Sequence, residues 1–228
     1  MNRTKIEWTD YTWNPITGCK HGCPYCYARK IAMRFKKAFP EGFEPTFHPE
    51  RLTEPIKLRN NPSKIFTVSM GDMFGDWVPE LWHRLIYNTI SACPYHQFQI
   101  LTKAPHNIHK NIKEWPKNTW IGTSLTGGEW PNVAHDRLRN IRKHNGIRFV
   151  SFEPLLNDGV LSYIDLCGID WVIIGAQTNP TKIPDMNKIE RVVTMADKAG
   201  AKVFIKNNIL DSEGGAFCWP RRDFPVIK

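Results

Sequence analysis

The sequence predicts an α/β fold built as a full or partial TIM-like barrel, in which parallel strands are joined by helices. Short runs of β-branched and aromatic residues alternate with segments whose apolar residues recur at helical spacing, as in βα units. The chain has 228 residues, of which 41% are hydrophobic, enough for one barrel domain with a sizeable core. We therefore expect residues 1–228 to form a single domain, with functional residues at the carboxyl ends of its strands.

Strands are predicted where a short apolar run ends in polar or turn-forming residues. In a barrel these ends meet on one rim, and seven polar ends together indicate a site there more strongly than any single polar loop does. Seven runs fit, namely Tyr11–Ile16, Lys64–Ser69, Gln97–Leu101, Thr119–Thr123, Arg148–Phe152, Trp171–Ile174 and Lys202–Ile205.

Helices are predicted between the strands, where apolar residues recur every three or four positions. Gly200 is a suitable residue to end the last of them. Residues 41–62 contain four prolines and are expected to form a long irregular connection. The predicted helices are Tyr25–Phe39, Pro79–Ser91, one that follows Pro105 and carries Ile108, Ile112 and Trp115, one that carries Arg137 and Arg139, and one from Met186 to Ala196.

A cysteine cluster follows the first predicted strand. Three of the six cysteines lie within eight residues, in the C-x3-C-x2-C run Cys19-Lys20-His21-Gly22-Cys23-Pro24-Tyr25-Cys26. Three clustered thiolates can hold three irons of a [4Fe–4S] cluster, because soft sulfur ligands suit iron and their charge offsets that of the metal. Such a cluster keeps one iron open to a small molecule, so the motif indicates chemistry rather than electron storage.

Two other interpretations of the cysteines remain open. A zinc knuckle would take His21 or the distant Cys93 as its fourth ligand, although zinc sites usually repeat a C-x2-C pair and no second pair exists here. A disulfide framework is disfavoured, because residues 1–8 carry no apolar run typical of a signal peptide. We therefore expect a cytoplasmic protein with reduced thiols.

The loop resembles that of the radical S-adenosylmethionine (radical SAM) superfamily, C-x3-C-x-aromatic-C, at all four defining positions: Cys19, Cys23, Tyr25 and Cys26. The resemblance implies that the open iron chelates the amino and carboxylate groups of SAM. It also implies that a flavodoxin- or ferredoxin-like donor reduces the cluster, which then cleaves SAM to a 5′-deoxyadenosyl radical that takes hydrogen from a substrate.

The resemblance also implies further cofactor-binding residues. The backbone near Tyr25 would contact the SAM adenine. Met70, Gly71 and Asp72 occupy the place of the superfamily's Gly-Gly-Glu strip, which holds the SAM ammonium. The ribose and carboxylate of SAM would be met by Thr123, Ser124, Ser151 and Glu153, and an anionic group by Lys103 or Lys206. Glu153 follows an apolar run and would be costly to bury alone, so a lysine partner is expected if SAM is not its partner.

Over nearly its whole length the chain is similar to a phage- and prophage-associated radical SAM family that lacks an assigned reaction. The similarity extends more weakly to the spore photoproduct lyase branch, which repairs DNA. The chain departs from the pattern of the phage-associated family at two places, Gly175-Ala176-Gln177-Thr178 and Lys206-Asn207-Asn208-Ile209. The matching motifs include residues 5–9, 13–15, 47–52, 69–74, 101–103, 151–156 and 220–222.

The charge of the chain favours an anionic partner such as nucleic acid. The formal net charge is +9 and the isoelectric point is near 9.3. The cations gather in three groups, of which Arg29, Lys30, Arg34, Lys36 and Lys37 directly follow the cysteine loop; the others are Arg137, Arg139, Arg142 and Lys143, and Arg221 with Arg222. No run of about eighteen apolar residues occurs, so no membrane span is expected.

The sequence therefore predicts a radical SAM enzyme that acts on nucleic acid or a nucleotide-like molecule. The alternatives are radical modification of a peptide or protein, and a nucleic-acid-binding protein whose iron–sulfur or zinc centre is only structural. The last predicts that metal loss unfolds the chain and that SAM has no effect.

Overall fold

The computed structural model describes residues 1–211 and 221–226. Two compact units make up the chain, Met1–Ile121 and Gly122–Lys228. Each unit carries parallel strands joined by helices, which confirms the predicted α/β fold. The strand pairings of the described residues close no barrel, so a full barrel is not confirmed, and the single domain over residues 1–228 remains a prediction.

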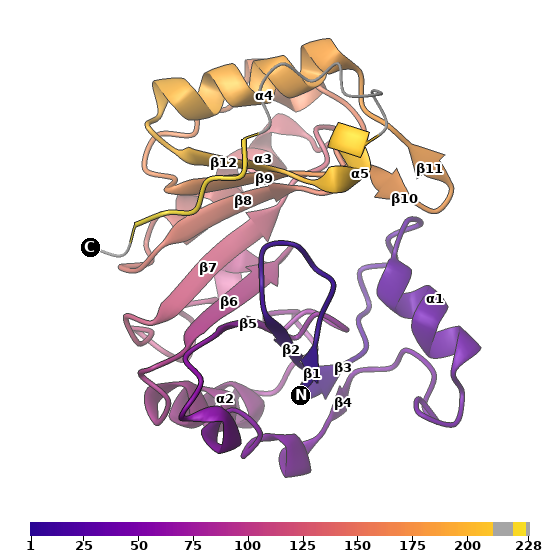
Figure 1. Ribbon diagram of the computed structural model, residues 1–228, viewed down its shortest axis with the longest axis vertical. Helices are drawn as coiled ribbons and strands as arrows, with labels where there is room; N and C mark the ends of the chain where they lie inside the picture. Colours follow the sequence, from indigo (N-terminus) through magenta and orange to yellow (C-terminus); the bar gives the residue numbers. More distant parts are fainter. Residues whose placement is uncertain (212–220, 227–228) are drawn as a thin grey trace. The chain divides into compact units, whose positions relative to one another are not determined.

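The first unit contains four neighbouring strands of the central sheet, all of them labelled in Figure 1. Its strands pair in the order β1 (Asn2–Arg3), β2 (Tyr11–Trp13), β5 (Lys64–Thr67) and β6 (Gln97–Thr102). The last three are parallel, with Tyr11 opposite Ile65 and Lys64 opposite Gln97, while β1 is an antiparallel edge strand. The carboxyl ends of β5 and β6 therefore lie side by side.

The remaining elements of the first unit connect or flank this sheet. Helix α2 (Glu80–Ser91) links β5 to β6 and buries Ile86 and Ile90 completely. The segment after β2 forms β3 (Ile16–Thr17), α1 (Tyr27–Arg34) and β4 (Thr46–Phe47), and β3 pairs with β4. The irregular connection predicted over residues 41–62 is thus interrupted by β4 and by short 3₁₀ turns at Pro49–Arg51 and Ile56–Leu58; another such turn is Pro105–Asn107.

The second unit contains the other strands and helices. Strand β7 (Thr119–Ser124) begins before the boundary, and β8 (Arg148–Phe152), β9 (Trp171–Ile174) and β12 (Lys202–Ile205) pair in parallel in that order. All four residues of β9 are fully buried, as in a parallel strand covered on both faces. The other elements are α3 (Pro131–Ile141), α4 (Met186–Lys198), α5 (Asn207–Leu210), the hairpin of β10 (Gln177–Thr178) and β11 (Thr181–Lys182), and a 3₁₀ turn at Gly159–Ser162.

The prediction of a helix after Pro105 is wrong. The chain forms only the 3₁₀ turn Pro105–Asn107 and then continues in turns. The indole of Trp115 donates to the carbonyl of Ile108 at 3.0 Å, and an α-helix would need that carbonyl for the backbone of Ile112. Ile108 and Trp115 are both buried, so their spacing reflects a folded loop that buries two side chains.

Candidate functional site

The cysteine loop lies in the first unit, between β3 and α1, and two glycines hold it against the turn that follows β5. Gly18 and Gly71 form a parallel bridge, and the amide of Gly18 donates to the carbonyl of Met70 at 2.9 Å. A Cβ on Gly71 would lie 2.7 Å from the carbonyl oxygen of Gly18. Only glycine therefore allows the residue before Cys19 to approach the segment Ser69–Asp72 this closely.

The turn after β5 begins with a strained residue. Val68 has a φ of 61°, a left-handed conformation that is rare for a β-branched side chain. Its amide donates to the carbonyl of Trp13 at 2.7 Å, and the amide of Gly71 returns to the carbonyl of Val68 at 3.3 Å. The surrounding contacts thus hold Val68 in a costly conformation at the start of the predicted SAM-binding strip.

Two of the three loop sulfurs have an N–H donor. The ammonium of Lys103 lies 3.2 Å from the sulfur of Cys23, and the amide of Arg29 lies 3.4 Å from that of Cys26. All three cysteines are half-buried. Hydrogen bonds to sulfur and partial burial are the surroundings that a protein supplies to cluster-ligating thiolates.

The chemistry of this donor set fits an iron–sulfur cluster. Burial raises the pKa of Cys19 to about 12, with Asp72, Cys23 and Cys26 adding to the rise. That thiol keeps its proton until a metal displaces it. Among the described residues no three His, Cys, Asp or Glu side chains are grouped to hold a single metal ion, whereas the cysteines of an iron–sulfur cluster each ligate a different iron.

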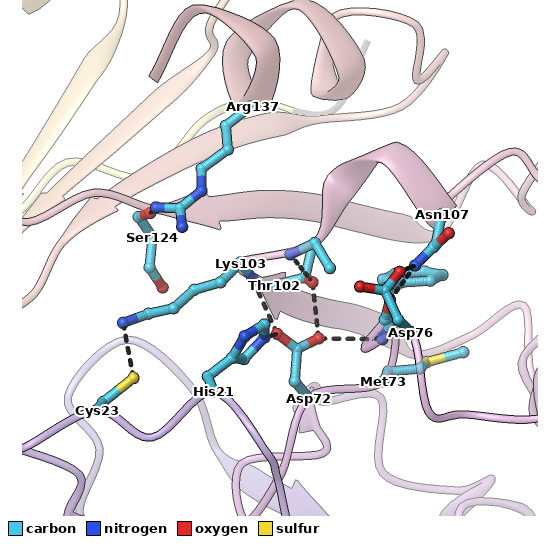
Figure 2. Close-up of polar contacts among 12 residues, drawn as sticks. His21, Cys23, Asp72, Met73, Asp76, Thr102, Lys103, Asn107, Ser124 and Arg137 are labelled. Carbon is cyan, nitrogen blue, oxygen red and sulfur yellow. Dashed lines mark hydrogen bonds and ion pairs between the residues drawn. The ribbon is translucent and has the colours of Figure 1, made fainter. Parts of the chain in front are cut away.

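Asp72 is the centre of a buried hydrogen-bond network (Figure 2). Its carboxylate accepts from the His21 ring at 2.7 Å, the Thr102 hydroxyl at 2.7 Å and the amides of Lys103 at 2.9 Å and Phe74 at 3.0 Å. Burial alone would raise the pKa of Asp72, but the bonds from His21, Lys103 and Thr102 outweigh it and hold the pKa below its ordinary value. The ionised carboxylate therefore ties the cysteine loop to the carboxyl end of β6.

The network gives Asp72 a role that the sequence does not reveal. Four donors already occupy its carboxylate, so within the described residues it acts on the loop rather than facing outward as an open acceptor. His21, which the sequence offers only as a zinc ligand, emerges as a positioning residue, and Trp77 packs edge-on against it with ring centroids 4.9 Å apart. The predicted contacts of Met70, Gly71 and Asp72 with SAM remain predictions.

Lys103 reaches from the end of β6 into the cysteine loop (Figure 2). Besides Cys23, its ammonium contacts the hydroxyl of Tyr25 and lies 4.7 Å from the centre of the Tyr25 ring. Burial alone would lower the pKa of Lys103, but Tyr25 and Cys23 raise it above its ordinary value, so the side chain stays charged. The sequence predicts an anion-binding role for Lys103, and in the structure it faces a cysteine sulfur.

The other predicted residues lie in the second unit. Glu153 pairs with Lys206, the second of the two lysine partners expected for it. A Cβ on Gly175 would lie 3.0 Å from the Glu153 side chain and 3.1 Å from that of Lys206, so glycine leaves room for the pair. Arg137 donates to the carbonyl of Ser124 at 3.0 Å. Thr123 and Ser151 are fully buried, and the Ser151 hydroxyl has no hydrogen-bond partner in the described part of the chain.

The remaining cysteines do not gather into a second cluster within the described residues. Cys93 is buried and Cys167 is exposed. Cys218 and Pro220 lie outside the described residues. No helix in the described part of the chain is long and apolar enough to cross a membrane.

Fold and loop together define an α/β protein with a three-cysteine loop beside the carboxyl ends of parallel strands. The chain belongs to the family described as "Protein of unknown function (DUF5131)", whose model matches residues 3–208. That description names no reaction, and it does not support the expected link to phages. No curated protein matches the chain.

Solved structures of spore photoproduct lyase share the fold. A cysteine-to-alanine mutant has a TM-score of 0.60 at 14% identity, covering 90% of this chain and 79% of that chain. A double mutant with bound AdoMet and dinucleoside spore photoproduct has a TM-score of 0.51 at 13% identity, covering 86% of this chain. The present chain spans 63% of the length of that double mutant. At this identity the similarity establishes the fold.

Proposed function

We propose that the protein is a radical SAM enzyme in which Cys19, Cys23 and Cys26 hold three irons of a [4Fe–4S] cluster. With SAM on the open iron and one electron from a protein donor, this cofactor pair would supply the cleavage of SAM to methionine and a 5′-deoxyadenosyl radical, which would take hydrogen from the substrate. The observation that carries the proposal is the loop of three half-buried cysteines, two of whose sulfurs have N–H donors. The fold shared with spore photoproduct lyase, a radical SAM enzyme, supports it.

The chain's own residues hold and orient the cofactors in this proposal. Asp72 and His21 fix the loop, and Lys103 keeps a positive charge beside Cys23. Peptide groups of Met70 and Gly71 meet the SAM ammonium, because the Asp72 carboxylate is already hydrogen-bonded. The backbone near Tyr25 meets the adenine, and Thr123, Ser124, Ser151 and Glu153 supply contacts to ribose and carboxylate.

Nucleic acid or a nucleotide-like molecule is the proposed substrate. The formal net charge of +9 favours a polyanion. One structural neighbour is described with a bound dinucleoside spore photoproduct, a nucleic-acid-like molecule. A flavodoxin- or ferredoxin-like protein is the proposed electron donor, acting in the cytoplasm.

The test is SAM cleavage by protein purified and reconstituted without oxygen. Dithionite and SAM are added and 5′-deoxyadenosine is measured by mass spectrometry. We expect product from the native chain and from Cys167→Ala, an exposed cysteine outside the loop, and none from Cys23→Ala. A bound cluster whose EPR signal does not change with SAM, and which leaves SAM intact, would instead identify a structural centre.

A further inference from the structure

Helix α1 has its small residues inside and its large apolar residues outside. The two residues that it buries are Ala28 and Ala32, four positions apart on one face. Eleven large hydrophobic side chains are exposed among the described residues, and four of them lie in the nine residues 27–35: Tyr27, Ile31, Met33 and Phe35. Met33 is 55% exposed and Phe35 52%. This reverses the usual arrangement of an amphipathic helix and indicates a surface that binds a partner.

The same surface is strongly basic. Residues 27–40 contain five cations and no acidic residue; the cations are Arg29, Lys30, Arg34, Lys36 and Lys37. Arg34, Lys36 and Lys37 are exposed and make no ion pair within the described residues. The nearest acidic residues along the chain are Glu41 and Glu44, and Glu44 pairs with Lys20. We call the exposed residues of segment 27–37 the α1 face.

The α1 face is fixed directly beside the cysteine loop. Cys26 caps the helix, its sulfur accepting the amide of Arg29. The hydroxyl of Tyr27 donates to the carbonyl of Ser69 at 2.6 Å, in the turn that carries Met70 and Gly71. A partner bound to the α1 face is therefore brought close to the loop that we propose to hold the cluster.

We propose that the α1 face binds the sugar–phosphate backbone and bases of single-stranded nucleic acid. Arg34, Lys36 and Lys37 supply the phosphate contacts, and the exposed ring of Phe35 supplies a stacking surface for an unpaired base. A helix that lies on a membrane separates its apolar and charged faces, whereas here Lys30 and Arg34 lie between Met33 and Ile31 around the helix. The inference deepens the proposed function by naming where the substrate binds, but it needs no radical step.

The test measures binding by the full-length, cluster-loaded chain without SAM. Fluorescence anisotropy follows a fluorescein-labelled single-stranded oligonucleotide of mixed sequence, with salt varied from about 50 to about 200 mM. The variant is Arg34→Gln/Lys36→Gln/Lys37→Gln. Its matched control is Lys57→Gln/Arg59→Gln/Lys117→Gln, which removes the same charge from three other exposed positions.

We expect the α1 variant to bind at least about tenfold more weakly, and the slope of log affinity against log salt to fall by about 2. Phe35→Ser should weaken binding while leaving that slope unchanged, because it removes stacking and no charge. The control should bind like the native chain. Equal losses in both triple variants, or binding to phosphatidylserine vesicles and to no oligonucleotide, would overturn the proposal.

Failure of this proposal is distinguishable from failure of the proposed function. SAM cleavage without substrate is assayed in the same α1 variant, whose altered residues contact neither the loop sulfurs nor Asp72 within the described residues. Oligonucleotide binding that is insensitive to the α1 variant, together with intact 5′-deoxyadenosine formation, would place the substrate elsewhere on a radical SAM enzyme.

Discussion

Lys103 is placed where it would affect the reduction potential of a cluster bound by the cysteine loop. Its ammonium lies 3.2 Å from the sulfur of Cys23, and its backbone amide is fixed by Asp72. A cation beside a ligand sulfur stabilises the more negative, reduced form of a cluster more than the oxidised form. Lys103 should therefore raise the reduction potential.

Replacing Lys103 by Met should lower the midpoint potential of the reconstituted cluster by on the order of 50 mV. The estimate follows from about 1 kcal/mol of lost differential stabilisation in a one-electron couple. The measurement is an EPR-monitored redox titration, with the exposed Lys117→Met as the control for charge alone. An equal potential in native protein and Lys103→Met would show that the ammonium leaves Cys23 when iron binds.

Gly71 provides a second prediction at a single residue. A methyl group there would meet the Gly18 carbonyl oxygen at 2.7 Å, and this oxygen belongs to backbone that cannot rotate away. Gly71→Ala should therefore displace the loop, reduce the iron bound per chain and lower the free energy of unfolding by about 1–3 kcal/mol. Gly159→Ala is the control, because its nearest neighbour would be 3.9 Å away. Iron analysis and urea denaturation measure the two effects, and full iron loading in Gly71→Ala would contradict the role given to this glycine.

Among the structural elements, the segment before β5 is joined to the loop before β6 by the buried histidine His96. The amide of Ser63 donates to Nδ1 of His96 at 3.2 Å, and Nε2 lies 3.0 Å from the carbonyl of Pro55. This pattern requires a neutral ring with its proton on Nε2. Burial lowers the pKa of His96, and the bond to Pro55 only partly opposes this.

The stability of the chain should therefore fall as the pH drops below about 6.5, the ordinary pKa of histidine. Below that pH His96 binds a proton in the unfolded state but not in the folded state. The loss of stability therefore continues until the pH reaches the pKa of His96 in the folded state. It amounts to at most about 1.4 kcal/mol per pH unit for one side chain. Urea denaturation at pH 7 and pH 5 should show a smaller difference in His96→Gln. The exposed His135→Gln should behave like the native chain, and an undiminished difference in His96→Gln would refute this assignment.

The elements that the sequence predicts best are the buried strands. Their apolar runs end in polar residues, and six of the seven begin and end within two residues of prediction. The first strand ends earlier, at Trp13, because Pro15 has no amide for the ladder and the side chain of Asn14 accepts the amide of Met70. Helix α1 ends at Arg34 rather than Phe39, where the chain turns with Ala38 and Phe39 both bonded to the carbonyl of Phe35.

The candidate site was predictable in its local part only. A fixed spacing identifies Cys19, Cys23 and Cys26, because all three belong to one loop. The contacts of His21 with Asp72, and of Cys23 with Lys103, join residues 51 and 80 positions apart. Sequence periodicity does not predict contacts between residues so far apart. The positioning role of His21 can therefore be inferred only from the structure, in which the carboxyl ends of β5 and β6 lie side by side.

At the scale of the whole molecule, the three cysteines belong to the first unit, Met1–Ile121, and so do Lys103 and Arg29, the residues that donate to their sulfurs in the described part of the chain. A cluster that ligates these sulfurs constrains the loop, α1 and, through Asp72, the end of β6. Strands β9 and β12 of the second unit pair with each other mainly through apolar, buried residues, and none of the bonds described to the loop sulfurs comes from them. Binding energy released at the loop should therefore stabilise the chain unevenly.

Hydrogen exchange with and without the cluster tests this unevenness. Iron chelation should speed exchange about tenfold or more for residues 18–34 and for the amides of Phe74 and Lys103, which donate to Asp72. Exchange in β9 and β12 should change little. A chain with Cys19, Cys23 and Cys26 all replaced by Ser should match the chelated protein, because it lacks the ligands rather than the iron. If chelation instead exposes β9 and β12 as strongly as the loop, the centre supports the entire fold, and the structural-centre interpretation becomes the better one.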